Sequence, residues 1–284
     1  KLMFREYDIR GIWNEDITEE ISYYIGRAYA TKLLSLKKNK MIVGYDNRLS
    51  SPIIEKNLVK GLTDGGVDVV RLGLVTTPMY YYAWDKLNIH CGIMITASHN
   101  PKEYNGFKMS YNGIHNCFGN EVAELYYIIL NGIYSKGNGS ITDANIKEDY
   151  IKMINSHINM GSNKLKVIYD CGNGTTSIVA KDIFVSNDNI EYIPLFAESD
   201  GTFPNHHPDP AVESNLTILK EKVKELNADC GIAFDGDGDR VGVVTHEGNY
   251  LSMDQYMILM VRSILPTSEN KRVLYDVKCS KSLV

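Results

Sequence analysis

Cysteine is scarce in this sequence, and the few cysteines lie far apart. Five occur among 284 residues, with no Cys-x-x-Cys pair. They are Cys91, Cys117, Cys171, Cys230 and Cys279. An odd number at such spacings is not typical of a disulfide framework or of a zinc site. We therefore expect reduced, mostly buried thiols in a cytoplasmic protein, and no zinc.

An excess of positive charge and long apolar runs are also missing. The 35 Asp and Glu residues outnumber the 30 Lys and Arg residues, which gives a formal net charge of −5. We therefore expect no nucleic-acid partner, and a small anionic substrate would have to be met by local basic side chains. Apolar runs such as Tyr256–Val261 are far too short to cross a bilayer. The N-terminal stretch KLMFREYD has no apolar signal-peptide core, so we expect no membrane partner.

Strand-like and helix-like segments alternate along almost the whole chain, in which 44% of residues are hydrophobic. This alternation predicts an α/β fold made of consecutive three-layer α/β/α domains with mixed sheets, two complete and a third truncated. We expect these domains at residues 1–145, 146–252 and 253–284. A stretch rich in Gly, Ser and Asn, Asn131–Asn145, marks the first boundary. The helix-like Asp254–Ile264 and the strand-like Arg272–Val277 would begin the third domain.

Three aspartates separated by single glycines form the most informative pattern, DGDGDR. Carboxylates as close as Asp235, Asp237 and Asp239 repel each other unless a cation compensates them, and glycine lets the backbone turn so that they converge. Such an oxygen-only set suits Mg²⁺. An EF-hand loop would need Gly and Glu where this chain has Arg240 and His246. Arg240 instead places a cation beside the site, as phosphate handling requires.

A second pattern, GIMITASHNP, ends an apolar strand in a polar cluster at Gly92–Pro101. Adjacent Ser98 and His99 suggest a nucleophile and its base. In an extended segment, however, neighbouring side chains point to opposite sides, and no GxSxG elbow surrounds the serine. We therefore expect no nucleophile–base hydrogen bond between them. Polar donors followed by Lys102 and Lys108 suit a bound anion, and a phosphate carried on Ser98 itself would fit.

These motifs resemble those of the α-D-phosphohexomutase superfamily, in which TASHNP, NGFKM and DGDGDR occur in this order. FREYDIRG (Phe4–Gly11) and DGTFPNHHPDP (Asp200–Pro210) resemble specifically its phosphomannomutase/phosphoglucomutase branch. YDVKCS (Tyr275–Ser280) looks like the start of the third of four domains. The resemblance therefore covers only the N-terminal part of the family. It implies that the missing domains would recognise the sugar and grip the substrate's non-transferring phosphate.

The resemblance also implies a mechanism. Ser98 would carry a phosphoryl group to and from a hexose 1-phosphate or 6-phosphate of mannose or glucose, through a hexose 1,6-bisphosphate. One Mg²⁺ would be held by Asp235, Asp237, Asp239 and an oxygen of the phosphate on Ser98. The other implied site residues are His99, Lys108, Arg10 and Arg240 as catalytic groups, with Tyr7, Arg10 and Lys278 as substrate-binding groups.

Alternative functions remain open from the sequence. The chain is expected to be an incomplete, inactive or weakly active fragment that could self-associate through its truncated third domain. A non-catalytic Mg²⁺-binding remnant or an interaction fragment is one alternative. An NAD-binding dehydrogenase domain is another, supported only by Gly172-x-Gly174 after a strand, with Ser177 where a third glycine would be needed.

Overall fold

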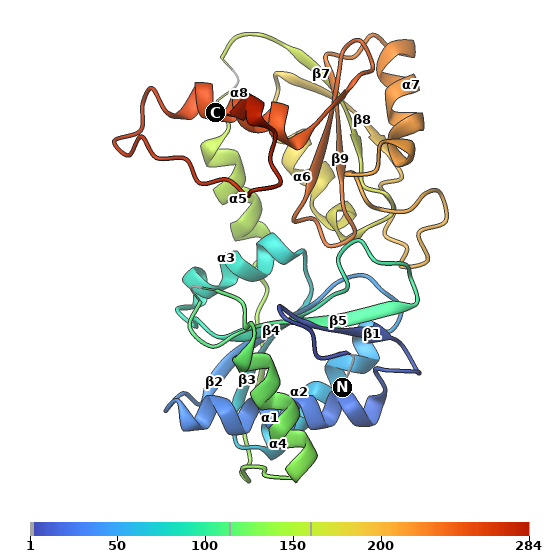
Figure 1. Cartoon of the computed structure of the whole chain (residues 1–284). Coiled ribbons are helices and arrows are strands. Elements are labelled where there is room, and N and C mark those ends of the chain that lie inside the picture. Colours follow the sequence, from blue (N-terminus) through green and yellow to red (C-terminus); the bar gives the residue numbers. More distant parts are fainter. Residues whose placement is uncertain (1–2, 114, 160, 284) are drawn as a thin grey trace.

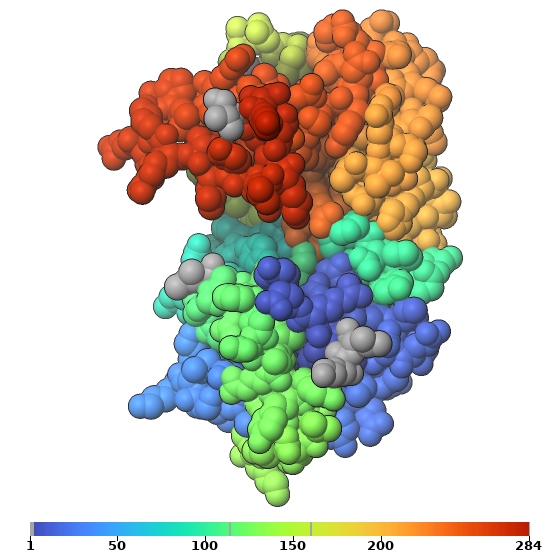
Figure 2. Space-filling model, in the orientation of Figure 1, coloured from blue at the N-terminus to red at the C-terminus, as the bar shows by residue number. Residues whose placement is uncertain are grey.

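The structure, a computed structural model, describes residues 3–113, 115–159 and 161–283. Two α/β units are stacked on one another, and a C-terminal helix with an irregular tail lies beside the second unit (Figure 1). The space-filling view shows the teal segment around residue 100 at the junction of the two units (Figure 2). The arrangement is the predicted layered α/β architecture.

A six-stranded mixed sheet, in the order β1-β5-β4-β2-β3-β6, forms the centre of the first unit. Its strands are β1 (Ile9–Ile12), β2 (Lys40–Tyr45), β3 (Asp68–Leu74), β4 (Gly92–Ile95), β5 (Tyr104–Ser110) and β6 (Ile141–Asp143). The strands β4, β2, β3 and β6 run parallel to one another, while β5 pairs antiparallel with both β4 and β1. The short edge strand β6 lies inside the Gly- and Ser-rich stretch that the sequence marked only as a boundary.

Helices cover both faces of this sheet. They are α1 (Glu19–Ser35), α2 (Ser51–Asp64), α3 (Thr77–Leu87) and α4 (Asn120–Asn131). Because successive strand residues face opposite sides, Met41 and Val43 of β2 join the core beneath α1, α2 and α4, whereas Ile42 joins the core beneath α3. In Figure 1, α3 lies between the first sheet and the second unit.

The second unit contains a five-stranded mixed sheet in the order β11-β10-β9-β7-β8. Its elements are α5 (Lys147–His157), β7 (Leu165–Asp170), η1 (Thr175–Ile178), α6 (Ala180–Val185), β8 (Ile190–Leu195), η2 (Glu213–Leu216), α7 (Thr217–Glu225), β9 (Cys230–Phe234), β10 (Val241–Thr245) and β11 (Tyr250–Leu251). The strands β8, β7 and β9 are parallel, and β10 pairs antiparallel with both β9 and β11. A core around Ile168 and Leu219 joins the sheet to α7.

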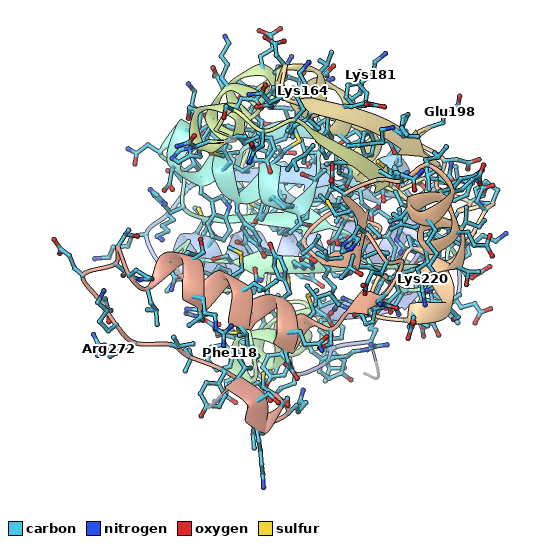
Figure 3. The ribbon with its side chains drawn as sticks, turned by 90° about the horizontal axis from the view of Figure 1, so that it is seen from above. Phe118, Lys164, Lys181, Glu198, Lys220 and Arg272 are labelled. Atoms are coloured by element: carbon cyan, nitrogen blue, oxygen red, sulfur yellow. The ribbon has the colours of Figure 1, made fainter. Side chains whose placement is uncertain are left out.

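After β11 the chain forms α8 (Met253–Ile264), which begins at a capping box between Ser252 and Gln255. None of the residues of α8 is buried. The predicted strand Arg272–Val277 is wrong, because this stretch is irregular up to the short helix η3 (Lys281–Leu283). In the described part of the chain no neighbouring strand pairs with it, and a strand needs such a partner for its backbone groups. Arg272 lies on the loop that projects beyond α8 (Figure 3).

Two further expectations concern membranes and thiols. Across the described residues, no helix combines the length and the apolarity that crossing a bilayer needs. All five cysteines are unpaired, and three of them are buried. This arrangement agrees with the prediction of reduced and mostly buried thiols.

Candidate active site

Ser98 lies three residues beyond the end of the fully buried strand β4, and 3% of its surface is exposed. Its φ angle is +53°, in the left-handed region that costs a residue with a side chain on the order of 1–2 kcal/mol. Hydrogen bonds hold both of its backbone groups. Its N–H donates to Thr96 Oγ1 at 2.8 Å, and its carbonyl accepts from Arg48 Nη2 at 2.9 Å. The turn therefore sets the direction of the serine hydroxyl.

That hydroxyl points at the aspartate loop of the second unit. Ser98 Oγ donates to Asp235 Oδ2 at 2.9 Å, across 137 positions of sequence. It also lies 3.3 Å from His99 Nδ1, so the prediction that these neighbours would not meet is wrong. The prediction assumed an extended backbone, and the positive φ of Ser98 turns the two side chains toward each other instead. Burial, followed by Arg240, lowers the pKa of His99, which keeps its imidazole neutral at pH 7.

The three aspartates occupy the loop between β9 and β10, and each offers an oxygen within 4.8 Å of the others. Asp235 and Asp237 are fully buried, while Asp239 is exposed at the edge. Gly236 explains how this loop comes so close to the serine. A Cβ at that position would lie 2.6 Å from the carbonyl oxygen of Ser98, so any side chain would push the two loops apart.

Lys108 of β5 supplies positive charge to this cluster. Its Nζ lies 2.7 Å from Asp237 Oδ2 and 2.6 Å from Asp239 Oδ2. Burial lowers the pKa of Lys108, but the two carboxylates outweigh burial and raise it. Burial also disfavours ionised Asp237, yet Lys108 and Thr77 overcome this and lower its pKa to about 2. Burial and then the two neighbouring carboxylates raise the pKa of Asp235 to about 8.

One oxygen of Asp237 is fully used, and the other has no partner. Oδ2 accepts from Thr77 Oγ1 at 2.7 Å and from Thr96 Oγ1 at 3.0 Å, in addition to Lys108. Oδ1 is buried without a hydrogen-bond partner among the described residues. Buried polar atoms are normally paired, and a carboxylate oxygen beside two more carboxylates suits a hard cation. The residues present therefore fit Mg²⁺.

Three further predicted residues, Arg240, Arg10 and Tyr7, differ in their contacts. Arg240 Nε is 3.9 Å from Asp235 Oδ2 on a half-exposed side chain. Arg10 of β1 donates to Asn100 Oδ1 at 2.7 Å and pairs with Asp8 at 2.7 Å, which places it beside the serine loop. Tyr7 is 71% exposed.

Lys278 is the predicted residue nearest the C-terminus. It is exposed in the segment after α8, and its backbone N–H donates to Asp276. Among the described residues, neither Lys278 nor Tyr7 forms a side-chain hydrogen bond or ion pair with the cluster. The structure thus does not bring these two together with Ser98.

The glycine turn that suggested a dinucleotide site has another role. Gly172 has a φ of +51°, and Gly174 packs against the aspartate loop, where a Cβ would lie 3.0 Å from the carbonyl oxygen of Gly236. The N–H of Thr175 donates to that same carbonyl at 2.9 Å. The turn therefore supports the aspartate loop from behind.

Two family models match the chain in succession. "Phosphoglucomutase/phosphomannomutase, alpha/beta/alpha domain I" matches residues 1–131, and domain II of the same description matches residues 148–248. The chain belongs to the phosphoglucomutase/phosphomannomutase family of α-D-phosphohexomutases. The order of the two matches along the chain is the order of the serine loop and the aspartate loop.

Relatives of this chain carry consistent names. It is 44% identical over 282 residues to a phosphomannomutase/phosphoglucomutase of Pseudomonas syringae pv. tomato, covering 99% of this chain and 60% of the relative. It is 39% identical over 283 residues to a phosphoglucomutase of Neisseria meningitidis serogroup B, covering 99% and 61%. The crystal structure of a phosphoglucomutase/phosphomannomutase family protein from Burkholderia thailandensis matches with a TM-score of 0.94 and 36% identity, covering 99% and 62%. The chain thus spans about three-fifths of the length of these relatives.

Proposed function

We propose that this chain carries the phosphoserine and the metal site of a phosphohexomutase of the phosphomannomutase/phosphoglucomutase type. Such an enzyme interconverts a hexose 1-phosphate and 6-phosphate. The contact between Ser98 Oγ and Asp235 carries the proposal. It joins the buried hydroxyl of a residue with a strained backbone to a carboxylate cluster in which one oxygen has no partner among the described residues. The names of the relatives support the reaction class.

In the proposed half-reaction, a hydroxyl oxygen of the sugar attacks the phosphorus carried on Ser98. The new P–O bond forms as the bond to Ser98 Oγ breaks, and its electron pair stays on the serine oxygen. The attacking hydroxyl must lose a proton. His99 suits acceptance of that proton because its lowered pKa keeps it neutral. Lys108, whose pKa is raised, stays an ammonium and stabilises negative charge.

The metal requirement follows from the donor set. Asp235, Asp237 and Asp239, with an oxygen of the phosphate on Ser98, would hold one Mg²⁺. When bound, Mg²⁺ would neutralise charge that builds up on the transferring phosphoryl group. Thr77 and Thr96 keep one oxygen of Asp237 occupied, so that the other oxygen stays available. A hexose 1,6-bisphosphate would load the serine in the reverse of the same step.

The test is phosphoryl uptake by the chain itself. The purified chain is incubated with Mg²⁺ and glucose 1,6-bisphosphate, and its intact mass and peptide map are recorded before and after phosphatase. We expect one phosphoryl group, located on Ser98. Ser98→Ala should take up none, whereas Ser35→Ala, an exposed serine on α1, should behave like the natural chain. A chain that never gains phosphate, or gains it equally in Ser98→Ala, contradicts the proposal.

We also infer that α8 can support self-association, because Leu259 and Ile264 on it are 53% and 52% exposed. Sedimentation velocity of Leu259→Lys against the natural chain tests this, and equal sedimentation at all concentrations would contradict it.

The unpaired cysteines support the expected cytoplasmic location.

A further inference from the structure

Arg48 lies just beyond the end of β2, and its guanidinium is buried beneath the loop that follows Ser98. The residue is 1% exposed. Its Nη1 and Nη2 groups donate to four backbone carbonyls, those of Ser98 (2.9 Å), Asn100 (2.7 Å), Pro101 (2.6 Å) and Tyr104 (3.0 Å). Its Nε donates to Asp46 Oδ2 at 3.1 Å. The serine loop is therefore wrapped around a single planar cation.

The geometry of this contact suits arginine and not lysine. A guanidinium offers five N–H donors in one plane, whereas an ammonium offers three on a tetrahedral nitrogen. All five donor directions of Arg48 are used, and four of them end on consecutive parts of one loop. Loss of the guanidinium would remove hydrogen bonds from all four carbonyls at once, including the buried carbonyl of Ser98.

Arg48 is itself fixed from two sides. Asp46 balances its charge, and the carboxylate also accepts from Ser51 Oγ at 2.7 Å. From the second unit, the ring of Phe203 lies over the guanidinium, with its centroid 5.3 Å from the central carbon. Gly201 packs so tightly nearby that a Cβ would lie 2.3 Å from the carbonyl oxygen of Asn47. The cation therefore sits between the serine loop and the second unit.

We propose that Arg48 is a positioning residue for Ser98, which it holds in the left-handed conformation that aims its hydroxyl at Asp235. The carbonyl of Ser98 accepts a hydrogen bond from Arg48, whereas its N–H donates to Thr96 within the same loop. Arg48 thus anchors the loop to the sheet. Its effect on phosphoryl transfer rests on the proposed function, but its effect on the loop does not.

The first experiment measures the loop without reference to catalysis. Backbone hydrogen exchange is compared in the natural chain, Arg48→Lys and two controls. Arg71→Lys changes a half-exposed arginine that pairs with Asp143, and Leu125→Ala weakens the buried core beneath α4. We expect the amides of residues 99–105, except that of Pro101, which has no N–H, to exchange about tenfold faster or more in Arg48→Lys alone. If this segment exchanges no faster than it does in Leu125→Ala, the proposal is overturned.

The second experiment measures the consequence for Ser98. The initial rate of phosphoryl uptake from glucose 1,6-bisphosphate should fall about 100-fold in Arg48→Lys and Arg48→Ala, as expected when a reacting group is displaced by about 1 Å. Millimolar guanidinium chloride should restore part of the rate to Arg48→Ala, and equal sodium chloride should not. If the substitution only disturbed the fold, guanidinium would not restore the rate selectively. A folded Arg48→Ala variant that guanidinium does not rescue therefore contradicts the proposal. If the natural chain takes up no phosphate, the proposed function fails, and hydrogen exchange still decides the role of Arg48.

Discussion

Replacing Lys108 with methionine should destabilise the chain strongly in the absence of divalent metal. The side chain is 14% exposed, and its ammonium is the nearest positive group to two of the three carboxylates. Removing one partner of a buried ion pair typically costs about 3–5 kcal/mol. We expect the free energy of unfolding to fall by about 3 kcal/mol, the lower end of this range. The reason is that Asp235 can take up a proton and so relieve part of the repulsion among the three carboxylates.

Saturating Mg²⁺ should reduce this loss. A ligand that binds only the folded state stabilises it by about 2.7 kcal/mol at one hundred times its dissociation constant. In Lys108→Met the metal meets carboxylates that no ammonium already occupies, so we expect a larger stabilisation by Mg²⁺ than in the natural chain. The difference in unfolding free energy between Lys108→Met and the natural chain should therefore decrease as Mg²⁺ is added.

The assay is urea unfolding followed by circular dichroism, with EDTA and with saturating Mg²⁺. Lys60→Met is the matched control, because Lys60 pairs with Asp64 on an exposed helix surface and should hardly shift the midpoint. Equal midpoints for Lys108→Met and the natural chain in EDTA would refute the argument that Lys108 compensates the buried aspartates.

Three further predictions test parts of the site. Gly236→Ala should abolish the rise in melting temperature caused by Mg²⁺. The added Cβ would lie 2.6 Å from the carbonyl oxygen of Ser98 and would push the aspartate loop away from the serine loop. Thr77→Val should lower stability by about 2 kcal/mol in thermal unfolding, and Thr77→Ser should not, because a hydrogen bond to the buried carboxylate of Asp237 is lost only in the former. Burial disfavours protonated His206, but its carboxylate partner Asp170 outweighs burial and raises the pKa of the imidazole. The substitution His206→Gln should therefore lower the free energy of unfolding most below about pH 6.5, and progressively less as pH rises through the folded pKa. A constant loss of stability from pH 6 to pH 9 would contradict this.

Much of the fold could be predicted from the sequence, because it depends on local patterns. Alternating strand-like and helix-like segments indicated layered α/β units, and turn residues marked most of their ends. The predicted strand at Arg272–Val277 failed because a strand forms only where a neighbour pairs with it. The edge strand β6 was missed for the opposite reason: three exposed residues in a Gly- and Ser-rich stretch have little strand character of their own and pair with β3.

Within the site, the predictable residues were those in dense motifs. The Asp-Gly alternation and the polar end of β4 single out Asp235 and Ser98 by their residue types and spacing. Thr77 and Arg48 carry no such signal. Thr77 meets Asp237 across 160 positions, and Arg48 gains its role from carbonyls about fifty positions away. The contact between Ser98 and its neighbouring histidine was mispredicted because a positive φ at a residue other than glycine cannot be read from the sequence.

The central claim is that a phosphate on Ser98 and a metal on the three aspartates occupy one site. The most direct test is the ³¹P resonance of the phosphorylated chain titrated with Mn²⁺ in place of Mg²⁺. We predict strong paramagnetic broadening of the phosphoserine signal at one equivalent of Mn²⁺, and no such broadening in Asp237→Asn. A phosphoserine signal that stays sharp while Mn²⁺ is bound to the aspartates would show that the phosphate and the metal occupy separate sites.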